Sequence, residues 1–426
     1  MEEHPGRREL ERAGTEESES REMESREHIS ARTWLTCFLL FLATSIVYLD
    51  RQVLALTAVK IIANFNLTNE QFGQIVAAFR YSYGLMQIFG GFLVDSYGPR
   101  LIFPIASGAW SLAGLLTGFA MTASMFTGLR FLLGAGEAFN WPCSLKVTNS
   151  LFSPKDRPLA NGIFNSGAAM GALAAPLIVT WITLSWSWRA AFVITGAIGG
   201  LWIFAWLWVT KESAGSLKGK RVAIKNVVQV IGRFLAMRDF WILMVSALII
   251  NSVSYYLSDW IPLYLETARG FSFARGNVLS IVVYCGTFSG NLLVGLFVRA
   301  LVARGNSTLT AKRWALFVAC LLMSFAISAG LMPNRYIAVL CLALTGIGVG
   351  AFLVIYLTLV QDLDPAYVGV SSGLLGGLSN IAYGAVSPYI GFLADRHDTI
   401  LILLLVGILP WFAFASIFFG KRFRTQ

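Results

Sequence analysis

The chain has 426 residues, of which 56% are hydrophobic and only 13% are charged. Soluble domains carry about twice that charged fraction, so the composition excludes a soluble globular protein. Apolar runs of about 20 residues, the length that crosses a hydrocarbon core, recur from Trp34 to Phe419. The composition therefore predicts an all-α, polytopic membrane protein.

The net charge of +10 does not indicate nucleic-acid binding, because the basic residues gather in particular connections between apolar runs. Residues 1–33 form a charged tail, whose first 30 residues hold ten Glu and five Arg; this predicts disorder and excludes a signal peptide. The long connection 210–238 and residues 421–426 are rich in Lys and Arg. By the positive-inside rule both termini are expected in the cytoplasm.

Twelve transmembrane spans are predicted in chain order, six on each side of a cytoplasmic linker. The N-terminal bundle covers 34–209, the linker 210–238 and the C-terminal bundle 239–420. The spans are about 34–58, 71–95, 101–121, 125–150, 158–184, 188–209, 239–265, 277–301, 313–331, 335–360, 367–393 and 399–420. This plan is typical of a transporter built from two six-helix bundles.

The first two spans carry charges within apolar sequence. Asp50 and Arg51 are adjacent in the first span, where each charge costs about 2.5–3.5 kcal/mol and so indicates a functional site. Arg80, Tyr83 and Gln87 share one helical face of the second span, as a cavity lining would. Arg suits a carboxylate, whereas Tyr and Gln suit hydroxyls. Alternatively, Arg80 forms an ion pair with another intramembrane acid and Tyr83 is a packing aromatic.

The stretch GGFLVDSYGPR, residues 90–100, ends the second span. Its glycines allow close helix approach and its aspartate can cap or pair with a neighbouring helix. The stretch resembles a loop signature of the major facilitator superfamily, and this resemblance implies a gating role; an ordinary capped turn is the alternative. The loop residues are Gly91, Asp95, Gly98 and Arg100. A similar pentapeptide, residues 391–395, ends the eleventh span and suggests internal repeats.

The fourth span contains RFLLGAGEAFNWPCSLK, residues 130–146. Arg130 and Glu137 are seven residues apart and share a helical face, and Pro142 is expected to bend the helix. Burial disfavours the charged form of a carboxyl group, so Glu137 is a candidate proton carrier. Alternatively, it only locks helices together through an ion pair with Arg130 or Arg51. The role of Lys146 stays open.

These motifs together resemble the anion:cation symporter family, a branch of the major facilitator superfamily that includes bacterial hexuronate and galactonate transporters and animal sialin. The resemblance rests on Tyr48-Leu-Asp50-Arg51, on Arg130-x6-Glu137-Ala138-x3-Pro142, on Lys146 to Arg157 and on residues 162–176. It implies that Asp50 and Glu137 couple protons and that Arg51 binds the substrate carboxylate. Tyr48, Arg130 and Ser166 are further candidates for substrate contact.

The chain departs from this family at three places. Arg299 stands where an acidic residue is usual after the eighth span, Ala168 replaces a glutamine of the fifth, and Arg80 is an added cation. The candidates for a polar cavity lining in the second half are Asn251, Tyr255, Tyr284, Asn291 and Asn380. Asp259 and Glu266 are expected in a solvated outer mouth. The cysteines and histidines have no metal-site spacing, so no metal or cofactor is expected.

We interpret the sequence as that of a proton-coupled symporter, which carries a small hydroxylated organic anion such as a hexuronate or aldonate. An exchanger of organic anions or sugar phosphates, without proton coupling, is the alternative; a receptor would need a soluble signalling domain. No nucleotide fingerprint or catalytic triad indicates an enzyme. A monomer in the bacterial inner membrane, with no nucleic-acid partner, is expected.

The topology can be tested by thiol labelling of intact cells, in a background without the native cysteines. A reagent that cannot cross the membrane should label a cysteine placed at Ser187, before the sixth span. It should not label one placed at Ser216, in the linker. Reversed labelling would mean that the orientation is wrong.

Overall fold

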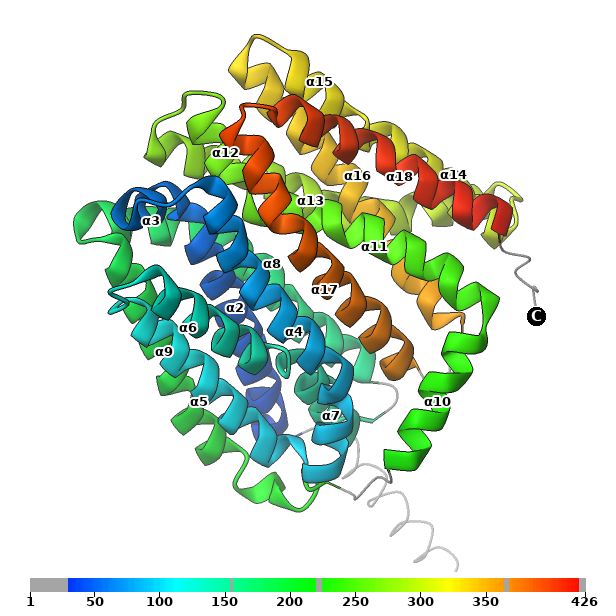
Figure 1. Ribbon diagram of the computed structural model, residues 1–426. Coiled ribbons are helices and arrows are strands. Elements are labelled where there is room, and N and C mark those ends of the chain that lie inside the picture. Colours follow the sequence, from blue (N-terminus) through cyan, green and yellow to red (C-terminus); the bar gives the residue numbers. More distant parts are fainter. Residues whose placement is uncertain (1–29, 154–155, 220–223, 364–367, 421–426) are drawn as a thin grey trace, which may run out of the picture.

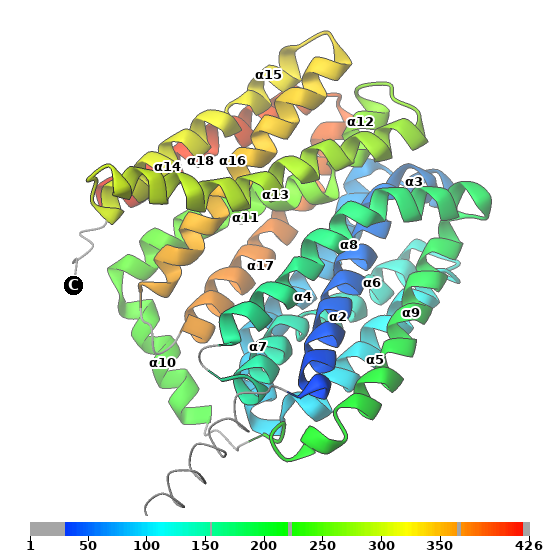
Figure 2. The ribbon, with the colours of Figure 1, turned by 180° about the vertical axis from the view of Figure 1, so that it is seen from behind.

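The computed structural model describes residues 30–153, 156–219, 224–363 and 368–420. Within these ranges the chain is helical and contains no strand. The helices form two six-helix bundles that lie side by side (Figures 1 and 2), joined by a linker with a short 3-10 turn, η1 (Glu212–Ala214), and the helix α10 (Ile224–Ala236). The predicted fold class is therefore confirmed.

The first bundle is built from six spans, two of which are interrupted. The first span comprises α2 (Ala31–Leu56) and α3 (Ala58–Phe65), and the fourth comprises α6 (Ala123–Glu137) and α7 (Asn140–Leu151). The uninterrupted helices are α4 (Asn69–Tyr97), α5 (Pro99–Thr117), α8 (Arg157–Ser185) and α9 (Trp188–Val209). Pro142 lies in the first turn of α7, where its missing N–H costs no helical hydrogen bond.

The second bundle also contains two interrupted spans. These are α11 (Arg238–Asp259) with α12 (Ile261–Thr267), and α14 (Thr308–Met323) with α15 (Phe325–Leu331). The other four are α13 (Phe273–Ala303), α16 (Arg335–Gln361), α17 (Val368–Asp395) and α18 (Thr399–Gly420). Pro262 at the start of α12 marks the break in the seventh span.

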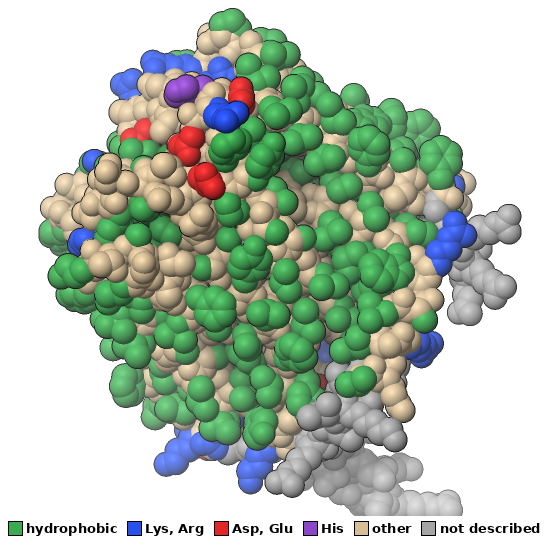
Figure 3. All heavy atoms as spheres, in the orientation of Figure 1, with side chains coloured by type: hydrophobic (Ala, Val, Ile, Leu, Met, Phe, Trp, Pro, Cys, Tyr) green, Lys and Arg blue, Asp and Glu red, His purple; other side chains and the backbone are tan. Residues whose placement is uncertain are grey.

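Within the described ranges, nine helices are long and apolar enough to cross a membrane. The remaining three spans are α4, the α6–α7 pair and α17. Since α4 and α17 are the helices along which the two bundles pack, several of their polar residues and glycines, such as Arg80, Gly84 and Asn380, are buried in protein. Figure 3 shows the corresponding exterior, a broad belt of hydrophobic side chains with Lys and Arg gathered toward its edges.

The bundles are joined mainly at one end, here named the far end, where α3, α12 and α15 lie; the opposite end, with α10, is the linker end (Figure 1). One continuous hydrophobic core runs through the second bundle and the far half of the first. The linker half of the first bundle has its own separate core. The hydrophobic packing between the bundles is therefore continuous at the far end, whereas the linker half of the first bundle packs on its own.

Hydrogen bonds reinforce this closure at the far end. Asp395 at the end of α17 accepts the backbone N–H groups of Asn69 and Glu70, both at 3.0 Å, and thereby caps α4. Asn277 of α13 donates to Leu56 O and to the hydroxyl of Thr180, at 3.1 and 3.0 Å. The two similar pentapeptides noted in the sequence consequently lie at opposite ends of the molecule.

A glycine on α4 makes the far-end closure testable. A Cβ at Gly73 would lie 2.5 Å from Ser387 O and 2.7 Å from Pro388 Cα, both backbone atoms of α17. Gly73→Val should therefore favour separation of the bundles at this end. A cysteine replacing Ala55, which is 4% exposed, should become reactive to a polar thiol reagent in a background without the native cysteines.

The matched control is Gly290→Val. Gly290 of α13 packs against the backbone of Ile347 in α16, and both helices belong to the second bundle. Separation of the bundles cannot relieve that clash, so this variant should lose stability without exposing position 55. Equal reactivity in the two variants would contradict the assignment of the far-end contact.

Candidate functional site

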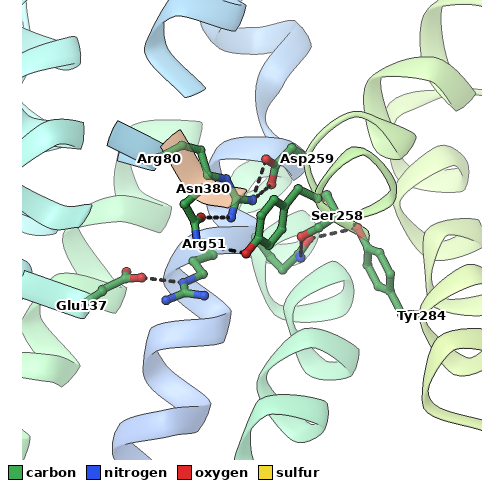
Figure 4. A network of polar contacts seen from close by, with 9 residues as sticks. Arg51, Arg80, Glu137, Ser258, Asp259, Tyr284 and Asn380 are labelled. Carbon is green, nitrogen blue, oxygen red and sulfur yellow. Dashed lines mark hydrogen bonds and ion pairs between the residues drawn. The ribbon is translucent and has the colours of Figure 1, made fainter. Parts of the chain in front are cut away.

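The buried charges of the first bundle lie near the C-terminal end of α2 and within α4, and those of α4 meet the second bundle (Figure 4). Arg51 of α2 donates from Nε to Glu137 Oε2 at 2.6 Å. Glu137 is the last residue of α6, and its side chain is fully buried. One of the two ion pairs considered as alternatives from the sequence, that between Glu137 and Arg51, is therefore present.

The guanidinium group of Arg51 lies among three aromatic rings. Its Cζ is 5.1 Å from the ring centre of Tyr48, 4.5 Å from that of Tyr83 and 5.6 Å from that of Phe79. Such rings attract a cation through their negative faces and exclude water from it. The predicted residues Tyr48 and Tyr83 thus contact Arg51, whereas Phe79 had not been identified from the sequence.

Arg80 makes the second buried ion pair, and this one joins the bundles. Its Nη2 donates to both carboxylate oxygens of Asp259, at 2.7 and 2.9 Å, and its Nη1 to Asn380 Oδ1 at 3.3 Å. Tyr255 stacks on the guanidinium group, 3.9 Å from Cζ to the ring centre. Asn380 in turn donates to Tyr255 OH at 3.0 Å and to Gln87 Oε1 at 3.3 Å.

The expectation of a solvated mouth for Asp259 is wrong. The seventh span continues beyond Asp259 as α12, so this residue lies inside the protein, where its side chain is 14% exposed. The alternative hypothesis for Arg80, an ion pair with another intramembrane acid, agrees with its contact to Asp259. Glu266, close to the end of α12, is partly exposed.

Two charged side chains of the first bundle have buried polar atoms without a hydrogen-bond partner in the described part of the protein. Arg130 of α6 is 2% exposed and Asp50 of α2 is 2% exposed. Among the described residues, neither oxygen of Asp50 and neither Nε nor Nη1 of Arg130 has a hydrogen-bond partner. Arg130 Cζ lies 5.0 Å from the ring centre of Phe79. Three arginines therefore surround this one phenylalanine.

A small cavity lies between these groups. It has a volume of about 10 Å³ and is lined by Arg51, Leu54, Ala55, Val76, Phe79, Arg80, Arg130 and Asp259. That volume holds about one water molecule. A larger molecule does not fit into this cavity with the side chains in these positions.

A second set of contacts connects the bundles beside this cavity. Gln52 of α2 donates to Ser258 Oγ at 2.9 Å and accepts from the hydroxyl of Tyr284 at 2.9 Å. Tyr284 was expected as a polar lining, but Gln52 and Ser258 were missed. The signal for Gln52 was a polar residue in an apolar span directly after two charges.

Three other predicted residues lie apart from the cluster or make only local contacts. Ser166 is exposed and donates to Ile163 O of its own helix, at 2.7 Å. Asn251 donates to Ala247 O within α11, and Asn291 is exposed on α13. These positions are not brought into contact with Arg51 or Arg80.

The predicted gating loop lies at the linker end of α4. Asp95 accepts from Lys146 Nζ of α7 at 2.6 Å, which gives Lys146 a partner. Gly98 has a φ of +86° and packs against the backbone of Leu217 and Gly219 in the linker, so a side chain is excluded there. Gly91 has open space around it, and Arg100 is partly exposed. The loop thus contacts the linker directly.

The region from Leu40 to the eleventh span matches a known family. The model of the Major Facilitator Superfamily covers residues 40–382. A probable galactarate/D-glucarate transporter of Escherichia coli is 29% identical over 410 residues, covering 88% of this chain and 91% of that protein. The hexuronate transporter of Escherichia coli is 26% identical over 416 residues, covering 92% of both chains.

The fold also resembles solved structures of transporters. A bacterial homologue of the human lysosomal transporter Spinster, inward-facing and occupied, superposes with a TM-score of 0.70 at 20% identity, covering 91% of this chain and 92% of that one. A D-xylose-proton symporter gives a TM-score of 0.69 at 16% identity, covering 90% and 96%. At these identities the likeness concerns the fold alone.

The buried carboxylates differ in a way that a stability measurement can detect. Asp50→Asn removes a buried carboxyl group that has no hydrogen-bond partner among the described residues, so it should leave the melting temperature unchanged or raise it. Asp259→Ala removes the partner of Arg80, and breaking a buried pair costs about 3–5 kcal/mol, so it should lower the melting temperature by several degrees. A clear fall for Asp50→Asn would show that this carboxylate has a stabilising partner.

Proposed function

The chain belongs to the major facilitator superfamily and is a membrane transporter, not an enzyme, and on this basis we propose that it is a proton-coupled symporter of a hydroxylated sugar acid. Relatives named as transporters of galactarate, D-glucarate, galactonate and hexuronate support this substrate class. The substrate crosses by alternating access, as the two bundles close over it at one end and then at the other. The linker end faces the cytoplasm.

The observation that carries the proposal is the buried contact between Arg51 and Glu137. A guanidinium group binds carboxylates through paired N–H donors, and here its Nε is occupied by a carboxylate of the protein at 2.6 Å. A substrate carboxylate competes for the same cation. When Glu137 takes up a proton it loses its charge, and Arg51 is then free to bind the anion.

Asp50 supplies a second titratable group next to Arg51. It precedes Arg51 in the chain and is buried without a hydrogen-bond partner in the described part of the protein. A carboxylate that is buried in this way favours its neutral form. Proton uptake at these carboxylates offsets the negative charge that the anion brings into the site, one proton for each substrate carboxylate.

The test is Glu137→Gln, which fixes the side chain in a neutral form. Substrate binding should survive, and so should exchange of labelled for unlabelled substrate, because neither requires a proton to leave. Accumulation driven by a proton gradient in proteoliposomes should be lost, because the empty carrier must release its proton to reset.

Two other results would contradict the coupling role. If Glu137→Gln still accumulates substrate when only a proton gradient is applied, the protein is an exchanger or facilitator of organic anions. If binding, exchange and accumulation all fall together with the stability of the protein, Glu137 only locks helices. Asp50→Asn serves as the companion variant and should resemble Glu137→Gln.

A further inference from the structure

Arg80 and Arg51 line the same cavity but are neutralised in different ways. The acidic partner of Arg51 is Glu137, which belongs to the same bundle. The acidic partner of Arg80 is Asp259, which belongs to the other bundle. Figure 4 shows Arg80 reaching across to Asp259 while Asn380 approaches it from a third helix. The pair between Arg80 and Asp259 therefore depends on the bundles being together.

When the bundles separate at the far end, Asp259 moves away from Arg80 together with the second bundle. Arg80 is 5% exposed, and its Nε already lacks a hydrogen-bond partner among the described residues. An arginine left in such a place without a counter-ion is strongly unfavourable. Two arginines of the open site have then lost their acidic partner, Arg51 after protonation of Glu137 and Arg80 after withdrawal of Asp259.

We propose that the substrate is a sugar acid with two carboxylates, an aldarate, of which Arg51 binds one carboxylate and Arg80 the other. This inference rests on the proposed function and narrows its substrate class. Asp259 replaces the second carboxylate of the substrate on Arg80 when the far end closes. The same closure that hides the site from one side thus displaces the substrate toward the other.

The distances fit a diacid of this length. The Cζ atoms of Arg51 and Arg80 both lie 5.6 Å from the ring centre of Phe79, so they are at most about 11 Å apart. Six carbons joined by bonds of about 1.5 Å span roughly 6 Å between the terminal carboxylate carbons. Hydrogen bonds of about 2.8 Å at each end extend that reach, so one molecule can engage both cations.

The surroundings of Arg80 also suit a hydroxylated chain. Tyr83, Tyr255, Gln87 and Asn380 offer donors and acceptors near the two cations, and Asn380 already donates to both Gln87 and Tyr255. Hydroxyl groups between the two carboxylates can take over these bonds. A monocarboxylic sugar acid satisfies Arg51 but leaves Arg80 without an anion.

The experiment compares galactarate with galactonate, which differ only in whether carbon 6 is a carboxylate or an alcohol. Binding of each is measured by calorimetry on the purified full-length protein in detergent. The wild-type protein should bind galactarate tighter by on the order of tenfold to a hundredfold, as expected for a desolvated charge pair. Tighter or equal binding of galactonate would overturn the inference while leaving the proposed function in place.

The double variant Arg80→Gln with Asp259→Asn tests whether Arg80 causes the preference for galactarate over galactonate. Changing both residues leaves no unpaired buried charge, so the double variant should fold where the single Arg80→Gln does not. Its preference for galactarate should fall to about threefold or less, which is under 1 kcal/mol. If the double variant keeps the full preference, Arg80 does not bind the second carboxylate.

Arg51→Lys is the matched control. It keeps the charge but loses the planar fork, and it should weaken galactarate and galactonate by similar factors because both ligands share the first carboxylate. If Arg51→Lys weakens the binding of galactarate but not that of galactonate, Arg51 binds the second carboxylate and the assignment of the two arginines is overturned. If the wild-type protein binds neither acid, the proposed function fails together with the inference.

Discussion

The interior of this protein depends on the neutralisation of arginines that have been removed from water. Arg51, Arg80 and Arg130 all lie within 5.6 Å, measured from Cζ, of the ring centre of Phe79. Buried charges are tolerated only with counter-charges and hydrogen bonds. Glu137 and Asp259 supply two of these, one within a bundle and one between bundles. Any change that removes one counter-charge therefore requires another anion or a movement of the helices.

The helical framework holds these groups in place through a few local features. The break between α6 and α7 follows directly after Glu137, so this residue ends a helix at the level of Arg51. The break after α11 in the same way places Asp259 opposite α4. Glycines on α4 and α17, such as Gly84 and Gly377, bring the two backbones together. The charges of the two bundles can therefore meet across a narrow interface.

Much of the fold could be predicted from the sequence, because each span is a local apolar run of the right length. Arg51 and Glu137 could be proposed as site residues for a related reason, since a charge in an apolar span stands out without knowledge of its partner. The partners were harder to predict. Asp259 was assigned to a solvated mouth because its position relative to Arg80 depends on how α4 packs against the second bundle. Phe79 was missed because phenylalanine is common in membrane helices, and Gln52 because its partners, Ser258 and Tyr284, belong to the other bundle.

At the buried arginines, proton uptake by Glu137 releases Arg51 for the substrate anion, so protons and anion should move through the protein together. Simultaneous measurement of substrate and proton movement in proteoliposomes tests it most directly, with wild-type protein, a sugar acid gradient and no imposed pH gradient. Inward flow of the acid should carry protons with it and acidify the lumen. Flow of the acid at full rate with no change of internal pH would show that the protein moves the anion without protons.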